Sequence, residues 1–260
     1  MSWSNKADYR ETLIQKRLEK IDRIILFASG KGGVGKSLLS ATSALVLSRE
    51  GYRVGLLDLD LHGPSSSTIF GLSGPPVEAE EGLLPPGKLD VKVMSIDLFV
   101  KGRPLPLAGM EKREIIREMV AMTHWGDLDI LMVDMPPETG DVLLEALRLF
   151  KSKSEAIIIT LPSILSIKVV SRLVNILREL MIHIKGALVN MAWLETSSGV
   201  IEPYGPIPYN EIKEIGIDLI ATLPMDTEAS RAADLSDLNK LMNSRLAMEL
   251  YKIFRDQLID

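Results

Sequence analysis

The chain has 260 residues and a formal net charge of −5 at pH 7; 46% of the residues are hydrophobic and 25% are charged. This composition is typical of a globular α/β protein, and no charge-free apolar run reaches the ~18 residues that a membrane-spanning helix needs. The sequence contains no cysteine, which excludes disulfides, thiolate catalysis and cysteine-held zinc or iron–sulfur clusters. The polar N-terminus lacks the apolar core of a signal peptide, so we expect a cytoplasmic protein.

Short apolar runs alternate with helix-length segments along the chain. Strands are predicted at 23–29, 52–60, 91–99, 128–136, 155–162, 184–192 and 216–224, and helices at 36–50, 112–122, 140–150 and 166–180. Several strands are apolar almost throughout, as strands buried on both faces are. The order predicts one α/β domain over 1–260, with a mostly parallel sheet between two helical layers and loops at 71–90 and 195–211.

A glycine-rich segment follows the first predicted strand. It reads GKGGVGKS and matches the phosphate-binding pattern G-x-x-x-x-G-K-[ST] between a strand and a helix. Backbone N–H groups of such a loop, and the start of the following helix, surround phosphate groups. Lys36 is expected to reach the β- and γ-phosphates of ATP, and the Ser37 hydroxyl to bind Mg²⁺. The sequence therefore predicts a three-layer P-loop NTPase fold, with ATP or ADP held by Gly30, Lys31, Gly32, Gly33, Val34, Gly35, Lys36, Ser37 and Leu38.

Carboxylates end two further predicted strands. Asp58 and Asp60 lie on one face at the C-terminal end of the run LLDLD, where α/β sheets bind ligands. Asp134 closes the apolar run at 128–134, as a Walker B aspartate that can hold an Mg²⁺-bound water does. The Pro- and Gly-rich turn at 136–141 is predicted to be a switch loop that senses the γ-phosphate. Capping of the following loop is the alternative role for Asp58 and Asp60.

The motifs SGKGGVGKS, VGLLDLDLHGPS, HWGDLDILMVDMPPETGD, LVNM and ATLPMD fall within residues 22–235. In order and spacing they resemble the Mrp-type ATPases of the ParA/MinD/Mrp family, whose P-loop carries a second lysine. The resemblance implies a homodimer across the nucleotide site, in which Lys31 reaches the partner's phosphates; a solvated loop lysine is the alternative. It also implies that Asp60 orients the attacking water and that Asp58 supports the Mg²⁺ shell.

The resemblance further implies an adenine site near the end of the chain. It places Asn190 against the base, with Pro224 and Asp226 nearby; a turn-capping role is the alternative for Asn190. Mrp-type carriers of iron–sulfur clusters have a C-x-x-C pair soon after the NM segment, but residues 190–205 contain no cysteine. The segment at 106–110 also departs from the Trp-Arg-Gly-Pro usual there, which argues against a partner surface built at that segment.

Both ends of the chain are predicted to be helical. Residues 1–20 form a helical extension, and residues 244–260 a helix with one apolar stripe and a polar face of balanced charge. A balanced face gains little from anionic lipid, so we expect this helix to pack on the domain. The three histidines have no metal-ligand spacing, and the mild acidity of the chain argues against nucleic acid as the main partner.

Three functions remain open from the sequence. The first is a slow Mg-dependent ATPase that acts as a carrier or assembly factor for an unknown client, without a cysteine-bound cluster. The second is a positioning or partition switch that binds membrane or DNA, and the third is a regulatory module that binds nucleotide with little hydrolysis. The set Lys31, Lys36, Asp58, Asp60 and Asp134 favours hydrolysis. Lys31 also disfavours a small-molecule kinase on the same fold.

Overall fold

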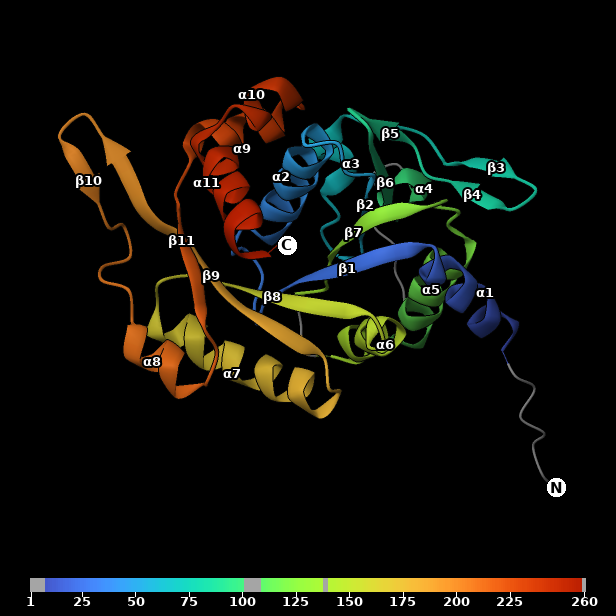
Figure 1. Cartoon of the computed structure of the whole chain (residues 1–260), viewed down its shortest axis with the longest axis horizontal. Coiled ribbons are helices and arrows are strands. Elements are labelled where there is room, and N and C mark those ends of the chain that lie inside the picture. Colours follow the sequence, from blue (N-terminus) through green and yellow to red (C-terminus); the bar gives the residue numbers. More distant parts are fainter. Residues whose placement is uncertain (1–7, 101–108, 138–139, 259–260) are drawn as a thin grey trace.

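A central sheet lies between two layers of helices in the computed structural model, which describes residues 8–100, 109–137 and 140–258 (Figure 1). Its strand order is β10-β9-β8-β1-β7-β2-β6-β5, with β11 beside β9. Pairing is parallel except for β5 and β10 at the edges, and the α/β P-loop NTPase fold predicted from the sequence is confirmed. The strands are β1 Ile21–Ala28, β2 Val54–Asp58, β3 Val77–Ala79, β4 Gly82–Leu84, β5 Gly87–Lys88, β6 Val91–Ser95, β7 Leu128–Asp134, β8 Ser154–Thr160, β9 His183–Thr196, β10 Gly199–Ile201 and β11 Leu219–Pro224.

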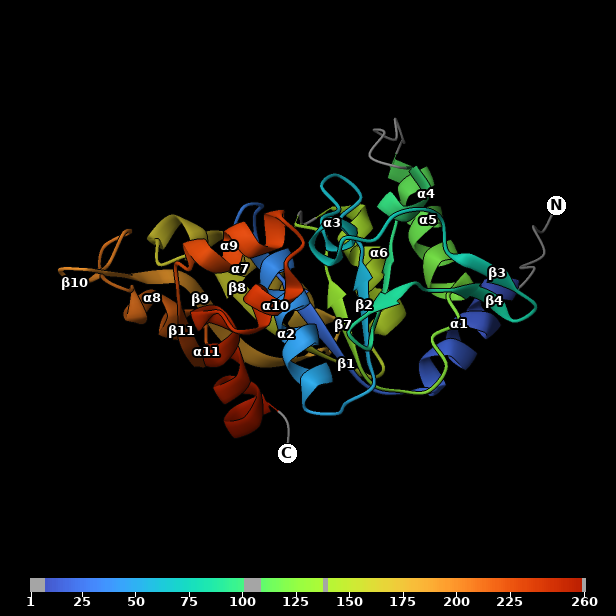
Figure 2. The same ribbon diagram turned by 90° about the horizontal axis from the view of Figure 1, so that it is seen from above.

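Helices follow most of the strands and cover both faces of the sheet (Figures 1 and 2). They are α1 Tyr9–Glu19, α2 Lys36–Arg49, α3 Ser66–Phe70, α4 Asp97–Val100, α5 Gly109–Met122, α6 Asp141–Phe150, α7 Ile164–Glu179, α8 Tyr209–Glu214, α9 Thr227–Asp234, α10 Leu238–Met242, α11 Arg245–Ile253 and the π-helical turn η1 Phe254–Leu258. The hairpin of β9 and β10 lies at one end of the molecule and α1 at the other (Figures 1 and 2).

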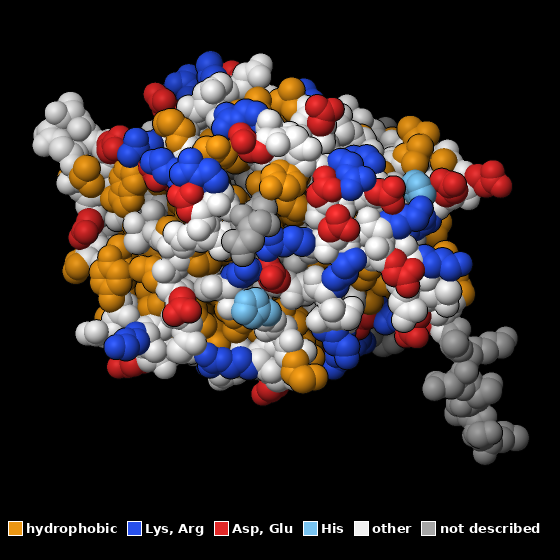
Figure 3. All heavy atoms as spheres, viewed as in Figure 1, with side chains coloured by type: hydrophobic (Ala, Val, Ile, Leu, Met, Phe, Trp, Pro, Cys, Tyr) orange, Lys and Arg blue, Asp and Glu red, His pale blue; other side chains and the backbone are white. Residues whose placement is uncertain are grey.

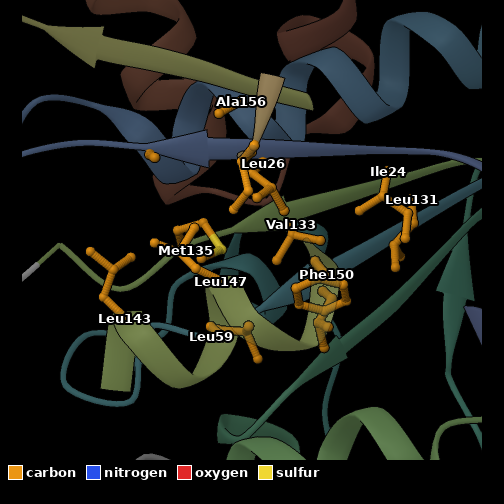
Figure 4. Close-up of a cluster of buried hydrophobic side chains, with 14 of the residues drawn as sticks. Ile24, Leu26, Leu59, Leu131, Val133, Met135, Leu143, Leu147, Phe150 and Ala156 are labelled. Carbon is orange, nitrogen blue, oxygen red and sulfur yellow. The ribbon is translucent and has the colours of Figure 1, made fainter. Parts of the chain in front are cut away.

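Two apolar cores form because successive side chains of a strand point to opposite faces of the sheet. In β1, Ile24 and Leu26 pack in the core beneath α1, α5, α6 and α7, whereas Ile25 and Phe27 pack beneath α2, α9 and α11. Figure 4 shows part of the first core, where Leu147 of α6 lies against the strands. These strands are therefore held from both sides, which fixes the positions of the residues that follow them.

The C-terminal helix packs on the body of the protein. Leu246, Leu250 and Ile253 of α11 are buried in the second core, as are Phe254 and Leu258 of η1. The N-terminal helix α1 buries Ile14 and Leu18 in the first core (residues 1–7 and 259–260 of the predicted terminal segments lie outside the described part). No helix of the described residues is long and apolar enough to cross a membrane. Acidic and basic side chains are mixed over the face shown in Figure 3.

Three expectations about local structure were wrong. The predicted strand at 91–99 ends at Ser95, because the chain turns into the short helix α4, and Asp97 near its start accepts a hydrogen bond from the Ser67 hydroxyl (2.7 Å). The predicted loop at 71–90 contains the hairpin of β3 and β4 as well as β5. The predicted loop at 195–211 contains the end of β9, β10 and the start of α8.

Candidate functional site

The glycine-rich loop runs from the end of β1 to the start of α2. Gly33 (φ +75°) and Gly35 (φ +85°) adopt left-handed conformations that other residues rarely take, and the Ser29 hydroxyl donates to the Lys31 carbonyl (3.0 Å). The loop borders a cavity of about 240 Å³ lined by Ser29, residues 31–38, Asp60, Gly63 and Pro137. Eight of the nine predicted loop residues therefore surround one cavity, together with Asp60.

Gly30, the ninth, faces α7 instead of the cavity. A Cβ atom added there would lie 2.9 Å from the backbone carbonyl carbon and side chain of Val169. The first glycine of the motif thus permits close packing of the loop on a helix. The spacing of the motif alone does not reveal this contact, because Val169 is far away in the sequence.

A buried charged cluster lies at the start of α2. The Lys36 ammonium donates to Oδ1 of Asp134 at the end of β7, and the side chains of both residues are almost inaccessible to solvent. Asp58, at the end of the neighbouring β2, is in register with Asp134. Asp58 accepts hydrogen bonds from the backbone N–H groups of Asp60, Ser65 and Ser66, each at 3.0 Å. The structure thus brings Lys36, Asp58 and Asp134 together.

Burial dominates the electrostatics of the two carboxylates. Loss of hydration and, next, the nearby charge of Asp134 raise the pKa of Asp58, whereas the Ser66 N–H group and the Lys36 charge oppose the rise; the net result is a pKa of about 7. Burial also raises the pKa of Asp134, against the opposing effect of Lys36. When both carboxylates are ionised, the one ammonium leaves an excess of negative charge in a dry site, which a bound cation would offset.

The donor set fits a divalent cation of the Mg²⁺ type. Asp134 Oδ2 is buried and has no hydrogen-bond partner among the described residues. The Ser37 hydroxyl is close enough to lower the pKa of Asp134, and Asp58 lies alongside. Carboxylate and hydroxyl oxygens are the ligands that Mg²⁺ prefers. In the part of the chain that the structure describes, no three His, Cys, Asp or Glu side chains gather into a metal-binding group, so a cation here would rely on two carboxylates, the Ser37 hydroxyl and oxygens from outside the chain.

Asp60 lines the same cavity as the loop. Its Oδ1 accepts hydrogen bonds from the backbone N–H groups of His62 and Gly63, both at 3.1 Å. The side chain is only partly buried, so one oxygen is free to meet a ligand or water. Asp58 and Asp60 therefore both cap the turn after β2, which was the alternative role for them, and Asp60 also lines the cavity beside the loop.

Lys31 is partly exposed and lines the cavity. Among the residues that the structure describes, its ammonium makes no ion pair or hydrogen bond. Lys36, five residues later, is buried and paired with Asp134. The two lysines of the loop thus differ in environment, and Lys31 is available to a ligand or a second protein chain.

Asn190 of β9 lies beneath the loop, not at its mouth. Its Nδ2 donates to the carbonyl of Val34 (2.8 Å), and the side chain is 3% exposed. A Cβ atom on Gly35 would approach the same Nδ2 to 2.3 Å. Asn190 therefore supports the loop directly, a role that the sequence did not suggest because Val34 is 156 residues away.

The other two residues expected near adenine lie at the end of β11. Pro224 is in register with Trp193 of β9. The Asp226 carboxylate accepts hydrogen bonds from Ala229 N–H (2.8 Å) and Leu246 N–H (2.9 Å), so it N-caps α9 and also satisfies an N–H group in the first turn of α11. The structure shows a helix-capping role for Asp226, and its contact with a base stays a prediction. The predicted switch loop includes residues 138–139, and the departure at 106–110 includes residues 106–108; both sets lie outside the described part.

Fold and site together define a P-loop nucleotide-binding protein. Residues 20–258 match the family model described as "ParA: NUBPL iron-transfer P-loop NTPase". The chain belongs to this family.

Relatives of known name support the assignment. The chain is 36% identical over 222 residues to the iron-sulfur cluster carrier protein of Rickettsia prowazekii, covering 84% of this chain and 66% of the relative. It is 33% identical over 228 residues to the protein of the same name from Aquifex aeolicus, covering 85% and 62%, respectively. It thus spans slightly less than two thirds of the length of these relatives.

Solved structures show the same fold. A nucleotide-binding protein from Archaeoglobus fulgidus, in complex with ADP, matches with a TM-score of 0.78 at 30% identity, over 95% of this chain and 96% of that one. The septum site-determining protein MinD from Pyrococcus horikoshii, complexed with Mg-ADP, matches with a TM-score of 0.65 at 20% identity, over 91% and 96%. The second likeness concerns the fold alone.

Proposed function

We propose that this chain is a dimeric, Mg-dependent ATPase of the Mrp type that serves as a carrier or assembly factor for a client protein. The observation that supports the proposal most strongly is the pair of lysines on one loop. Lys36 is buried against Asp134, as a lysine acting within its own chain should be, whereas Lys31 has no ionic partner in the described part of the chain. Lys31 is thus suited to meet charge supplied from outside the protomer.

The lysines of the loop and the carboxylates that follow the strands have separate roles in this proposal. Lys36 exchanges Asp134 for the β- and γ-phosphates when ATP binds, and Ser37, Asp58 and Asp134 hold Mg²⁺, which neutralises phosphate charge when bound. Asp60 accepts a hydrogen bond from the water that attacks the γ-phosphate. Lys31 of a second copy stabilises the charge that develops during transfer, as an arginine finger does.

Two observations bear on the cargo of such a carrier. The named relatives are iron–sulfur cluster carrier proteins, which supports a carrier role. The present sequence has no cysteine, so it offers no thiolate to a cluster. We infer a carrier or assembly factor in which ATP binding and hydrolysis determine how long a client stays bound. It binds no cluster through cysteine.

The C-terminal helix supports this reading over a membrane-binding switch. Leu246, Leu250 and Ile253 of α11 are buried against α2 and the sheet, so its apolar stripe already has a partner. Co-sedimentation with anionic liposomes and with DNA, each with Mg-ATP, tests the alternative. ATP-dependent binding to either would favour a positioning or partition function.

The decisive experiment measures ATP turnover across a wide range of protein concentration. We expect specific activity to rise with concentration, and Lys31→Ala to remove it while ADP still binds. Lys16→Ala, which removes an exposed lysine from α1, is the matched control and should retain full activity. Activity that is independent of concentration and of Lys31 would show that the dimer mechanism is wrong.

A further inference from the structure

A second cavity of about 240 Å³ adjoins the cavity beside the glycine-rich loop. Asp60 and Pro137 line both of them. The far side of the second cavity is formed by His62, Lys112 and the start of α6. Asp60 thus lies between the two cavities. The residues of the second cavity are therefore placed to influence the orientation of its carboxylate.

A short chain of hydrogen bonds leads from Asp60 to α5. Oδ1 of Asp60 accepts from the backbone N–H of His62, and Nε2 of His62 lies 2.9 Å from the Lys112 ammonium. An ammonium group has only donors, so His62 Nε2 is the acceptor and carries no proton in this contact. The contact therefore connects the turn that carries Asp60 to a helix that is remote in sequence.

Helix α5 is a firm anchor for such a contact. Ile116 and Val120 are buried in the first core. Arg117 forms an ion pair with Glu145 of α6 (2.6 Å) and another with Glu11 of α1 (3.2 Å). A helix held by an apolar face and by ion pairs to two neighbours moves little, so Lys112 offers the exposed His62 a fixed point.

We propose that Lys112 is a positioning residue: by holding His62 it fixes the turn at 60–63 and aims the Asp60 carboxylate at the attacking water. The inference rests on the proposed ATPase function and adds two residues, Lys112 and His62, to that site. Neither touches the phosphates in this proposal. Each acts through Asp60, where an error of about 1 Å in placement is costly to the rate.

The test compares Lys112→Met with Lys112→Arg, which keeps a donor, and with Arg113→Met, which removes a charge from the neighbouring position of α5. For Lys112→Met we expect kcat to fall about tenfold, with KM for ATP and the Kd of ADP changed less than about twofold. Lys112→Arg should recover at least about half of the lost rate, and Arg113→Met should keep the unmodified rate.

Hydrogen–deuterium exchange of a peptide covering 59–66 gives a readout independent of turnover. We expect faster exchange in Lys112→Met alone. An unchanged kcat would overturn the proposal, whether or not exchange changes, and so would a parallel loss of kcat and ADP affinity, which indicates general damage. If the unmodified chain hydrolyses no ATP, the proposed function fails and the inference fails with it. If the unmodified chain is active and Lys112→Met is equally active, only the inference fails.

Discussion

Asp58 and Asp134 lie side by side at the ends of adjacent parallel strands, and both are fully buried. Parallel strands bring their C-terminal residues to one edge of the sheet, which is how residues 76 positions apart become neighbours. Lys36 is the charge that offsets this pair in the structure. The site therefore holds two carboxyl groups and one ammonium where hydration is low, and its behaviour should depend on pH and on cations.

The first prediction concerns stability as a function of pH. The pKa of Asp58 is raised from 3.8 to about 7, so between pH ~4 and ~7 the folded chain binds a proton that the unfolded chain has released. The free energy of unfolding should consequently fall as pH rises across this interval, by at most about 4 kcal/mol at about 1.4 kcal/mol for each pKa unit. Urea unfolding at pH 5 and pH 8 measures the change.

Two variants identify the group responsible. Asp58→Asn should weaken the pH dependence and leave only the part that Asp134, whose pKa burial also raises, contributes. Asp129→Asn is the control, because the hydrogen bond from Arg53 lowers the pKa of Asp129 and its contribution changes only in more acidic solution. Stability that rises from pH 5 to pH 7 in the unmodified chain would contradict the assignment.

Removal of the Lys36 charge should destabilise the fold as well as abolish nucleotide binding. Lys36→Met leaves Asp134 buried without its ion-pair partner, which should lower the free energy of unfolding by about 3 kcal/mol or more. Adding Asp134→Asn should restore most of that stability but no affinity for ADP. Arg53→Met, which breaks the more exposed pair with Asp129, should cost less than about 1 kcal/mol. Equal losses for Lys36→Met and Arg53→Met would contradict the importance of burial.

Substitution by alanine should affect the stability of the protein differently at two glycines of the P-loop. Gly35 has a φ of +85°, and a Cβ atom there would lie 2.3 Å from Asn190 Nδ2, so Gly35→Ala should lower the free energy of unfolding by at least about 2 kcal/mol. An added Cβ at Gly32 meets nothing within 4 Å, and Gly32→Ala should change stability by less than about 0.5 kcal/mol. Thermal or urea unfolding distinguishes them, and similar losses would refute the steric explanation.

Two roles are considered for Asn190: support of the P-loop and contact with adenine. A comparison of ADP with GDP binding distinguishes them. Asn190→Ala removes the donor to the buried Val34 carbonyl, which should cost about 1–3 kcal/mol in stability. If Asn190 also contacts adenine, the variant should weaken ADP binding more than GDP binding, as measured by calorimetry. Equal weakening would leave Asn190 as a support of the loop alone and reject the adenine contact.

The sequence predicted the parts of the site that depend on local pattern. The loop at 30–37 and the aspartates at 58 and 134 follow apolar runs, and such runs become buried strands whose ends meet at one edge. The partners of those residues were not predictable. Lys36 with Asp134 and Asn190 with Val34 depend on which strands become neighbours and in what register. The end of the strand at 91–99 was missed because Ile96 and Leu98 continue an apolar pattern into a helix.

The close fit of the P-loop against Val169 behind it and Asn190 beneath it has a thermodynamic consequence. A free glycine-rich loop has more backbone conformations to lose than any other segment of its length, and closing it on a phosphate would consume much of the binding energy. Here the neighbouring helix and strand restrict the loop during folding. Most of the conformational entropy of the loop is therefore lost on folding, before a nucleotide arrives. Ordering the loop then subtracts little from the free energy of phosphate binding.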